Sequence, residues 1–227
     1  MSNSIELKNI SKHYITNKKN IILKKINFKF KRGLIYSLVG PSGSGKSTLL
    51  NLLSLIDKPT SGEIIINNTS IKYNDLSKND QLRADKIGII YQQNNLLPDF
   101  SALENVYLAR LTTDNNKEKS ILEATKIIKS FGLSKRMNHF PSELSGGELQ
   151  RVAISRALIN KPEIILADEP TGSLDHSTAK EVFKSLYKLK DKKRLIIYAT
   201  HNRLFANMAD CKLEMIDGNI RPSNARK

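Results

Sequence analysis

The stretch Gly40-Pro41-Ser42-Gly43-Ser44-Gly45-Lys46-Ser47-Thr48 decides the fold of this chain. It fits the pattern Gly-x-x-x-x-Gly-Lys-[Ser/Thr], with an apolar segment before it (34–39) and a leucine-rich one after it (47–56). A strand, a glycine-rich turn and a helix in this order bind phosphate, because backbone N–H groups and the positive helix end face the anion. We expect Lys46 to reach the β- and γ-phosphates of a nucleotide and the Ser47 hydroxyl to be a ligand of Mg²⁺. The alternative, a flexible loop without a ligand, does not explain the strand and helix around it.

A second motif is the acidic pair Asp168-Glu169, which follows the apolar segment 164–167. Two carboxylates at the end of a buried strand are unfavourable unless they serve a cation. We expect Asp168 to orient Mg²⁺ through water and Glu169 to polarise the attacking water as general base, a role that contributes about 10²–10⁴ in rate. Taken alone, an ordinary acidic loop before Pro170 explains this pair equally well.

A third motif is Leu144-Ser145-Gly146-Gly147-Glu148. Ser145 and Glu148 have the spacing of a capping box, and apolar residues at helical spacing follow them, so the pattern predicts a helix that begins here. Any helix could begin in this way. A helix start with two glycines and a serine also exposes amides and a hydroxyl to an anion, so this segment is a second candidate phosphate contact.

The remaining chain alternates strand and helix patterns, which predicts an α/β fold with a mostly parallel core sheet. Strands are expected at 5–9, 26–30, 87–91, 164–167, 195–199 and 212–216, and a hairpin at 62–71. The segment 96–159 is expected to be mostly helical. Within it, Ser101 to Glu104 is a capping box and 121–131 is a helix that ends at Gly132. The polar tail 221–227 is expected to have no regular structure.

Composition narrows the function classes. The chain has 227 residues, which suits one domain, and no apolar run approaches the roughly 20 residues of a membrane span. Its start has no apolar core of a signal peptide and its single cysteine allows no internal disulfide, so we expect a cytoplasmic location. The formal charge of +15 comes from lysines scattered over the whole length. We therefore expect no nucleic-acid partner, although the charge could help to hold the chain at an anionic membrane.

The run Leu144 to Arg156, LSGGELQRVAISR, closely resembles the signature of the ATP-binding subunits of ABC transporters. With the other two motifs in the same order, the resemblance covers nearly the whole chain. It implies an α/β P-loop NTPase fold of ABC type, with a mostly parallel core sheet and an antiparallel β subdomain. Residues 1–227 would form a single domain, in which a helical subdomain at about 93–160 is inserted.

The resemblance also assigns roles to single residues. Tyr14 looks like the aromatic residue that stacks on adenine. Gln92 looks like the glutamine that senses Mg²⁺ and contacts the membrane partner, and Gln93 beside it leaves the register open by one position. His201 matches the histidine that contacts the γ-phosphate. The loop that crosses the dimer interface matches Ser173, Leu174 and Asp175.

A second copy of the chain is implied as a partner. The two copies would hold two ATP molecules between them, with the phosphate loop of one copy facing the signature of the other. The resemblance further implies integral membrane transporter subunits, so that the chain is peripheral to the cytoplasmic face of a bacterial inner membrane and coupled to transport.

The resemblance is closest to the lipoprotein-releasing group of this family, whose lipoprotein substrate contacts the ATPase only indirectly. It is carried by 95–106, by 138–143 and by Leu213-Glu214-Met215. Leu149 departs from the polar residue usual in the family. Three alternatives stay open: a macrolide or peptide exporter, a cell-division ABC complex, and a nucleic-acid-linked ABC ATPase. The last usually has long insertions or two ATPase domains.

Overall fold

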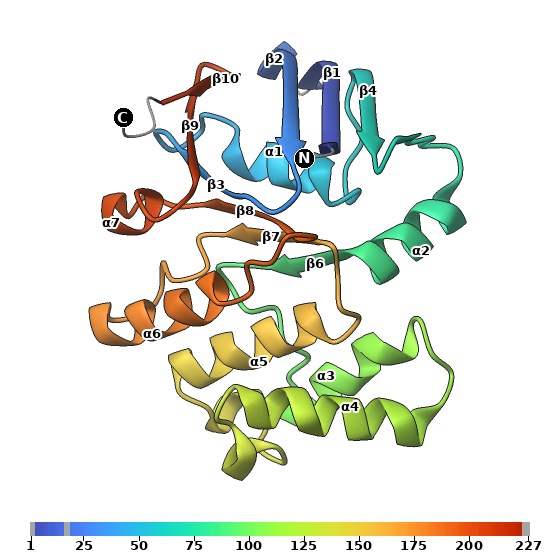
Figure 1. The fold of residues 1–227 in the computed structure, drawn as a ribbon, viewed down its shortest axis with the longest axis vertical. Helices are drawn as coiled ribbons and strands as arrows, with labels where there is room; N and C mark the ends of the chain where they lie inside the picture. Colours follow the sequence, from blue (N-terminus) through green and yellow to red (C-terminus); the bar gives the residue numbers. More distant parts are fainter. Residues whose placement is uncertain (1–2, 16–18, 224–227) are drawn as a thin grey trace.

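The computed structural model describes residues 3–15 and 19–223 (Figure 1). The strands are β1 (Asn3–Ile15), β2 (Lys19–Lys31), β3 (Ile35–Val39), β4 (Ser61–Ile66), β5 (Thr69–Ser70), β6 (Ile87–Ile90), β7 (Ile164–Asp168), β8 (Leu195–Ala199), β9 (Cys211–Ile216) and β10 (Asn219–Pro222). The helices are α1 (Lys46–Leu53), α2 (Leu76–Lys86), α3 (Ala102–Leu111), α4 (Lys117–Ser130), α5 (Gly146–Leu158), α6 (His176–Tyr187) and α7 (Arg203–Ala206), with 3₁₀ turns at Ser134–Arg136 and Pro141–Glu143.

The core sheet has the strand order β10-β9-β3-β8-β7-β6. All its neighbours pair in parallel except β10, which is antiparallel to β9. Alternate residues of a strand point to opposite faces of a sheet. In β8, Leu195 and Ile197 accordingly pack in one hydrophobic cluster, while Ile196 and Tyr198 pack in another. A sheet covered on both faces explains why its strands are continuous apolar runs in the sequence.

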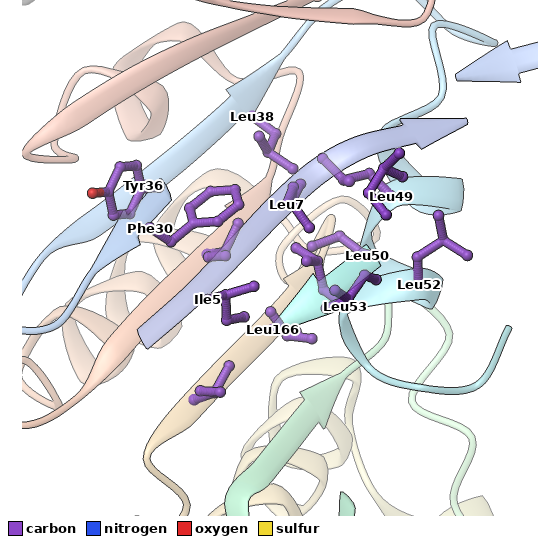
Figure 2. Packing of buried hydrophobic residues seen from close by; sticks show 14 of the residues in the cluster. Ile5, Leu7, Phe30, Tyr36, Leu38, Leu49, Leu50, Leu52, Leu53 and Leu166 are labelled. Atoms are coloured by element: carbon purple, nitrogen blue, oxygen red, sulfur yellow. The ribbon is translucent and has the colours of Figure 1, made fainter. Parts of the chain in front are cut away.

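A second, antiparallel sheet has the order β2-β1-β4-β5. It lies on the far side of α1 from the core sheet (Figure 1). The leucines of α1 pack between the two sheets with residues such as Ile5, Phe30 and Leu166 (Figure 2). The expected hairpin closes at Asn67 and Asn68, both with positive φ, as in a type I′ turn. This packing fixes α1, and with it the phosphate loop, against the core sheet.

The other face of the core sheet is covered by α5 and α6 (Figure 1). Beyond α5 lie α3 and α4, which share a separate apolar cluster with it. We call residues 93–160 the helical segment. The helix α5 takes part in both clusters, because Val152 packs toward α3 and α4 while Ile154 packs toward the core sheet. The predicted fold class is confirmed: a mostly parallel core sheet accompanied by an antiparallel sheet and inserted helices.

Several elements differ from the sequence prediction. The helix α2 was not expected, because Asn79 is its one buried residue and the pattern has no apolar face. The helix α6 was also missed, although Ala179, Val182, Phe183 and Leu186 have helical spacing. The expectation of an irregular tail is wrong at Arg221, since it pairs with Glu214 in the β10–β9 hairpin. Residues 224–227 of that tail lie outside the described residues.

The expected strand at 26–30 is part of β2, which begins at Lys19, and the expected helix at 121–131 begins at Lys117. The Asn116 side chain caps this helix by accepting a hydrogen bond from the Lys119 N–H, 2.9 Å away. No helix within the described residues is both long and apolar enough to span a membrane.

Candidate active site

The phosphate loop runs from the end of β3 to the first residue of α1. Gly45 is the N-cap of α1, with a φ of 103°, and no side chain of the described residues caps the helix. A side chain at Gly45 would need a rare left-handed backbone, and its Cβ would lie 2.8 Å from Cδ2 of Leu23. The first N–H groups of a helix have no partner within the helix. The start of α1 therefore has unsatisfied donors at its positive end, which suits an anion.

The Lys46 side chain lies across this loop. Its Nζ donates hydrogen bonds to the carbonyl oxygens of Gly40, at 2.9 Å, and Pro41, at 3.0 Å. Burial lowers the pKa of Lys46, and the nearby carboxylates of Glu169 and Asp168 oppose that shift. The Lys46 ammonium group thus already lies at the loop where phosphates would bind, near the carboxylates of Glu169 and Asp168.

The acidic pair lies at the carboxyl end of β7. Glu169 has a φ of 45° and its side chain is 14% exposed. Its Oε2 accepts a hydrogen bond from the backbone N–H of His201 at 3.2 Å, and its Oε1 lies 3.4 Å from Nε2 of the same histidine. Burial raises the pKa of Glu169, an effect that the His201 N–H partly offsets. A carboxylate with a raised pKa is a better proton acceptor near neutral pH.

A cavity of about 580 Å³ brings these groups together. Five separate segments contribute to it: β2, the phosphate loop with the start of α1, the segment after β6, the end of β7 with the turn that follows it, and the segment after β8. Its lining is Ile22, Ser42, Gly43, Gly45, Lys46, Ser47, Thr48, Gln92, Asp168, Glu169, Gly172 and His201. Parallel strands end at the same edge of a sheet, which is why segments distant in sequence meet at this cavity.

The structure also distinguishes Gln92 from Gln93. Gln92 lines the cavity and its side-chain amide lies next to Gly172, whereas Gln93 is not part of the lining. The geometry therefore favours Gln92 in the register that the sequence left open. Sequence reasoning missed Ile22 and Gly172. No local pattern marked Ile22, which lies on β2, while Gly172 follows the acidic motif in the turn after Pro170.

Tyr14 lies outside the lining of this cavity. It is on β1, 42% exposed, and its hydroxyl donates a hydrogen bond to Oδ2 of Asp57 at 2.8 Å. The Lys12 ammonium lies 4.7 Å from the centre of its ring. Burial and the carboxylate of Asp57 raise the pKa of Tyr14, while the Thr48 hydroxyl lowers it. The ring is thus near the end of the phosphate loop, and its stacking on adenine stays a prediction.

The signature segment, Leu144–Glu148, lies away from the cavity lining. Ser145 is the N-cap of α5 and forms the expected capping box: the Glu148 N–H donates to its Oγ, and Oε2 of Glu148 accepts from the Ser145 N–H at 2.9 Å. Arg136 donates to Oε1 of Glu148 at 2.8 Å. The Ser145 N–H, followed by Arg136, lowers the pKa of Glu148 to about 2. Within one chain, this helix start and the phosphate loop form no common site.

The loop 173–175 lies beside the signature segment. Asp175 caps α6 by accepting hydrogen bonds from the N–H groups of Ser177 and Thr178, and the Ser177 hydroxyl, 2.6 Å from Oδ1, contributes most to lowering its pKa. A Cβ at Gly146 would lie 3.4 Å from Leu174, and a Cβ at Gly147 would overlap the Thr178 methyl group. The absence of a side chain at Gly147 therefore allows the start of α5 to lie directly against α6, and the candidate interface residues 144–148 and 173–175 form one surface.

The donor set of the cavity fits Mg²⁺. Ser47, Gln92 and Asp168 supply hydroxyl, amide and carboxylate oxygens to one space, which is the ligand chemistry that Mg²⁺ prefers. Oε1 of Glu169, which lines the cavity, is buried without a hydrogen-bond partner in the described part of the chain, as a group that faces a polar ligand would be. The described residues hold no cluster of three His, Cys, Asp or Glu. A Mg²⁺ ion that shares phosphate oxygens needs only one or two protein ligands.

Comparisons with known proteins agree with this geometry. The family model "ABC transporter" matches residues 23–172. The chain therefore belongs to the ABC transporter family. It is 46% identical over 226 residues to the lipoprotein-releasing system ATP-binding protein LolD of Rickettsia bellii, covering 98% of this chain and 100% of the relative. The LolD protein of Wigglesworthia glossinidia brevipalpis is 45% identical over 224 residues, 97% of each chain.

Solved structures give the same result for the fold. A dimeric ATP-binding cassette in a post-hydrolysis state, bound to ADP and phosphate, superposes with a TM-score of 0.89 at 40% identity, covering 98% of this chain and 99% of that one. The protein cbiO1 of Clostridium perfringens, part of the ABC transporter complex cbiONQ, superposes with a TM-score of 0.85 at 28% identity, covering 99% of this chain and 90% of that one. The predicted family and fold are thus confirmed, and a nucleotide-binding ATPase is the class that fold and cavity define.

Proposed function

We propose that this chain is the ATP-hydrolysing subunit that powers release of lipoproteins from a bacterial inner membrane. The observation that carries the proposal is the identity of 46% to a lipoprotein-releasing ATP-binding protein, over 98% of this chain and the full length of that relative. The cavity contributes the chemistry, because a phosphate loop, a metal-binding carboxylate and a candidate general base line one space.

Nucleotide binding is assigned to the phosphate loop and its neighbours. Residues 40–48 hold the phosphates through backbone N–H groups and Lys46, with Tyr14 against the adenine. Ser47, Gln92 and Asp168 would hold Mg²⁺, which neutralises charge on the phosphates when bound. The ammonium of Lys46 moves from the carbonyls of Gly40 and Pro41 to the β- and γ-phosphates, exchanging neutral acceptors for charged ones.

Hydrolysis is assigned to Glu169 and His201. The Glu169 carboxylate accepts a proton from the attacking water, and its pKa, raised by burial, suits that task. The backbone N–H of His201 orients the carboxylate at 3.2 Å. The His201 side chain is 53% exposed at the cavity edge, where it can contact the γ-phosphate.

The complete site requires a second copy. In our proposal residues 1–227 form one ABC ATPase domain with a helical subdomain at about 93–160. The signature segment of one copy faces the phosphate loop of the other, and 173–175 cross the interface. Closure is passed through the region after Gln92 to integral membrane subunits. The chain is then peripheral to the cytoplasmic face of the membrane and contacts the lipoprotein only indirectly.

The test is to purify the chain with its membrane partners and reconstitute the complex in vesicles that carry a lipoprotein. We expect ATP-dependent transfer of the lipoprotein to a soluble acceptor, and no transfer with a non-hydrolysable analogue. Co-purification of an efflux or cell-division membrane protein, without transfer, would replace lipoprotein release with that activity. Stoichiometric DNA binding at physiological salt would instead indicate a nucleic-acid-linked ATPase.

A further inference from the structure

The chain passes between the core and the helical segment twice, around 91–95 and 159–163, and we call these two connections the crossings. At each crossing a side chain forms hydrogen bonds to the backbone. At the first, Arg156 of α5 donates to the carbonyls of Asn95, at 2.6 Å, and Asn94, at 2.7 Å. At the second lies Asn160, just after α5, in a position where α2, α3 and α5 meet. No motif in the sequence marked Asn160, and the proposed catalytic chemistry does not use it.

Both the nitrogen and the oxygen of the Asn160 side-chain amide form hydrogen bonds. Nδ2 donates to the carbonyl of Ala84, in the last turn of α2, at 3.1 Å, and to that of Ala109, in the last turn of α3, at 3.0 Å. Oδ1 accepts from Oγ1 of Thr113 at 3.0 Å and from Nη1 of Arg110 at 3.3 Å. The last four carbonyls of a helix have no partner within it. One side chain therefore donates to carbonyls at the ends of two helices, and the Ala109 carbonyl also accepts from the Thr112 hydroxyl at 2.8 Å.

The two helices belong to different parts of the molecule. The helix α2 packs beside the edge strand β6 of the core sheet, while α3 is in the helical segment. Ala84, Ala109 and Asn160 line one cavity of about 880 Å³. A bond to either carbonyl alone would only cap a helix. Bonds to both from one amide fix the distance between the core and the helical segment at this crossing.

The distance between the core and the helical segment at Asn160 affects the position of the other end of α5. The helix has 13 residues, and at 1.5 Å per residue it is about 20 Å long, so a tilt of about 10° about its end near Asn160 moves Ser145 by about 3 Å. A displacement of this size breaks hydrogen bonds, and a misplacement of about 1 Å at a reacting group can cost about a hundredfold in rate. The start of α5 is where the signature segment lies.

We propose that Asn160 is a positioning residue that sets the angle of the helical segment against the core, and thereby places the signature segment over the nucleotide of the partner copy. The inference rests on the proposed function only for the in-trans site. It adds one residue to the proposed function: Asn160 determines how the helical segment is oriented and therefore the geometry of the nucleotide site between the two copies. Asn160 does not line the cavity that holds the candidate catalytic residues.

The experiment compares Asn160→Ala and Asn160→Asp with Asn116→Ala. Asp has nearly the shape of Asn and keeps the acceptor for Thr113 and Arg110, but cannot donate to the two carbonyls. Asn116 also caps a helix in the helical segment, and within residues 3–15 and 19–223 it forms no hydrogen bond to the core. Three quantities are measured: ATP affinity of the isolated chain, ATP-driven dimerisation in a Glu169→Gln background, and hydrolysis by the assembled complex.

We expect both Asn160 variants to keep the wild-type ATP affinity of the isolated chain, because the phosphate loop lies in the core. Dimerisation should require more ATP, and hydrolysis should fall at least about tenfold, since the signature segment is misplaced by ångströms. Asn116→Ala should change neither. The inference is overturned if the Asn160 variants behave like Asn116→Ala, or if ATP affinity falls in step with hydrolysis, which would indicate loss of folding alone.

If Asn160→Ala does not fold, the isosteric variant Asn160→Asp is used for the comparison. If the wild-type complex releases no lipoprotein, the proposed function is wrong, but the comparison of the Asn160 variants with Asn116→Ala still tests the role of Asn160.

Discussion

Two helix starts in this molecule have nearly the same local chemistry and opposite surroundings. Both α1 and α5 begin with glycine and serine at the positive end of a helix. The start of α1 has no side-chain cap and lines a cavity with Asp168, Glu169 and His201. The start of α5 is capped by Ser145 and Glu148 and lines no part of that cavity. A phosphate-binding sequence thus forms a site only where other strands bring their carboxyl ends beside it, and α5 needs a partner surface for the same role.

The largest expected effect is loss of ATP binding, and it should distinguish the start of α1 from the start of α5. Lys46→Ala should abolish ATP binding by the isolated chain, because alanine cannot make the charge-assisted bonds to phosphate. Ser145→Arg should leave that binding unchanged and abolish hydrolysis by the assembled complex. Isothermal titration of each isolated variant with ATP, beside hydrolysis assays of each complex, checks both. Equal loss of binding in the two variants would show that the signature segment belongs to the site of its own chain.

Glu169→Gln should lower hydrolysis at least about a hundredfold while ATP binding persists. The amide keeps the shape of the side chain but cannot accept a proton from water. Because the phosphate contacts remain, ATP should drive a stable closed dimer, visible in light scattering. His201→Ala is the companion variant, since it removes the proposed γ-phosphate contact and keeps the candidate general base. Wild-type turnover by Glu169→Gln would mean that another group activates the water.

Mixing the two dead variants should restore activity. In a dimer of one Lys46→Ala chain and one Ser145→Arg chain, one composite site carries both lesions and the other carries neither. Random association of equal amounts of a symmetric dimer leaves about a quarter of all sites intact. Hydrolysis should therefore return to at most about that fraction of wild type. A mixture as inactive as its components, with mixed dimers shown by cross-linking, would contradict the in-trans site.

A smaller effect is expected from Gly147→Ala. The added methyl group would overlap the methyl group of Thr178 on α6, and overpacking of this kind costs about 1–3 kcal/mol. Thr178→Ser removes that methyl group, so the double variant should recover most of the loss in denaturant unfolding. Gly146→Ala is the control, because its Cβ would lie at an ordinary 3.4 Å from Leu174. A double variant no more stable than Gly147→Ala alone would exclude the steric explanation.

The smallest effect concerns the cap of α5. Glu148→Gln should cost at most about 1 kcal/mol at pH 7, because glutamine can still accept from the Ser145 N–H but lacks the negative charge that interacts with Arg136 and the helix dipole. The pKa of Glu148 is lowered in the folded chain from 4.5 to about 2, so its stabilising effect is present above 4.5 and is lost as the pH falls toward 2. Chemical denaturation of both proteins at several pH values measures this. A difference that stays constant below pH 4.5 would mean that the charge of Glu148 has no part in the cap.

Local patterns predicted much of this molecule, and the failures have physical reasons. Both capping boxes, at Ser101 and Ser145, were readable because their partners are three residues apart. The helix α2 was missed because a polar surface helix has no periodic apolar face. Ile22 and Gly172 were missed at the cavity because only their neighbours in space give them a role there. The need for glycine at position 147 was equally hidden, since it arises from Thr178 on another helix.

The sequence by itself determined the family, the phosphate loop, the acidic strand end and the start of α5, because each is a short segment whose chemistry depends on adjacent residues. The tertiary structure alone decided which of these meet. Parallel pairing of β7 and β8 brings Glu169 to His201, and burial then raises the pKa of the carboxylate. The same packing keeps the start of α5 outside the cavity and places Asn160 between two helix ends. These outcomes depend on distances between segments far apart in the chain, which local sequence patterns do not specify.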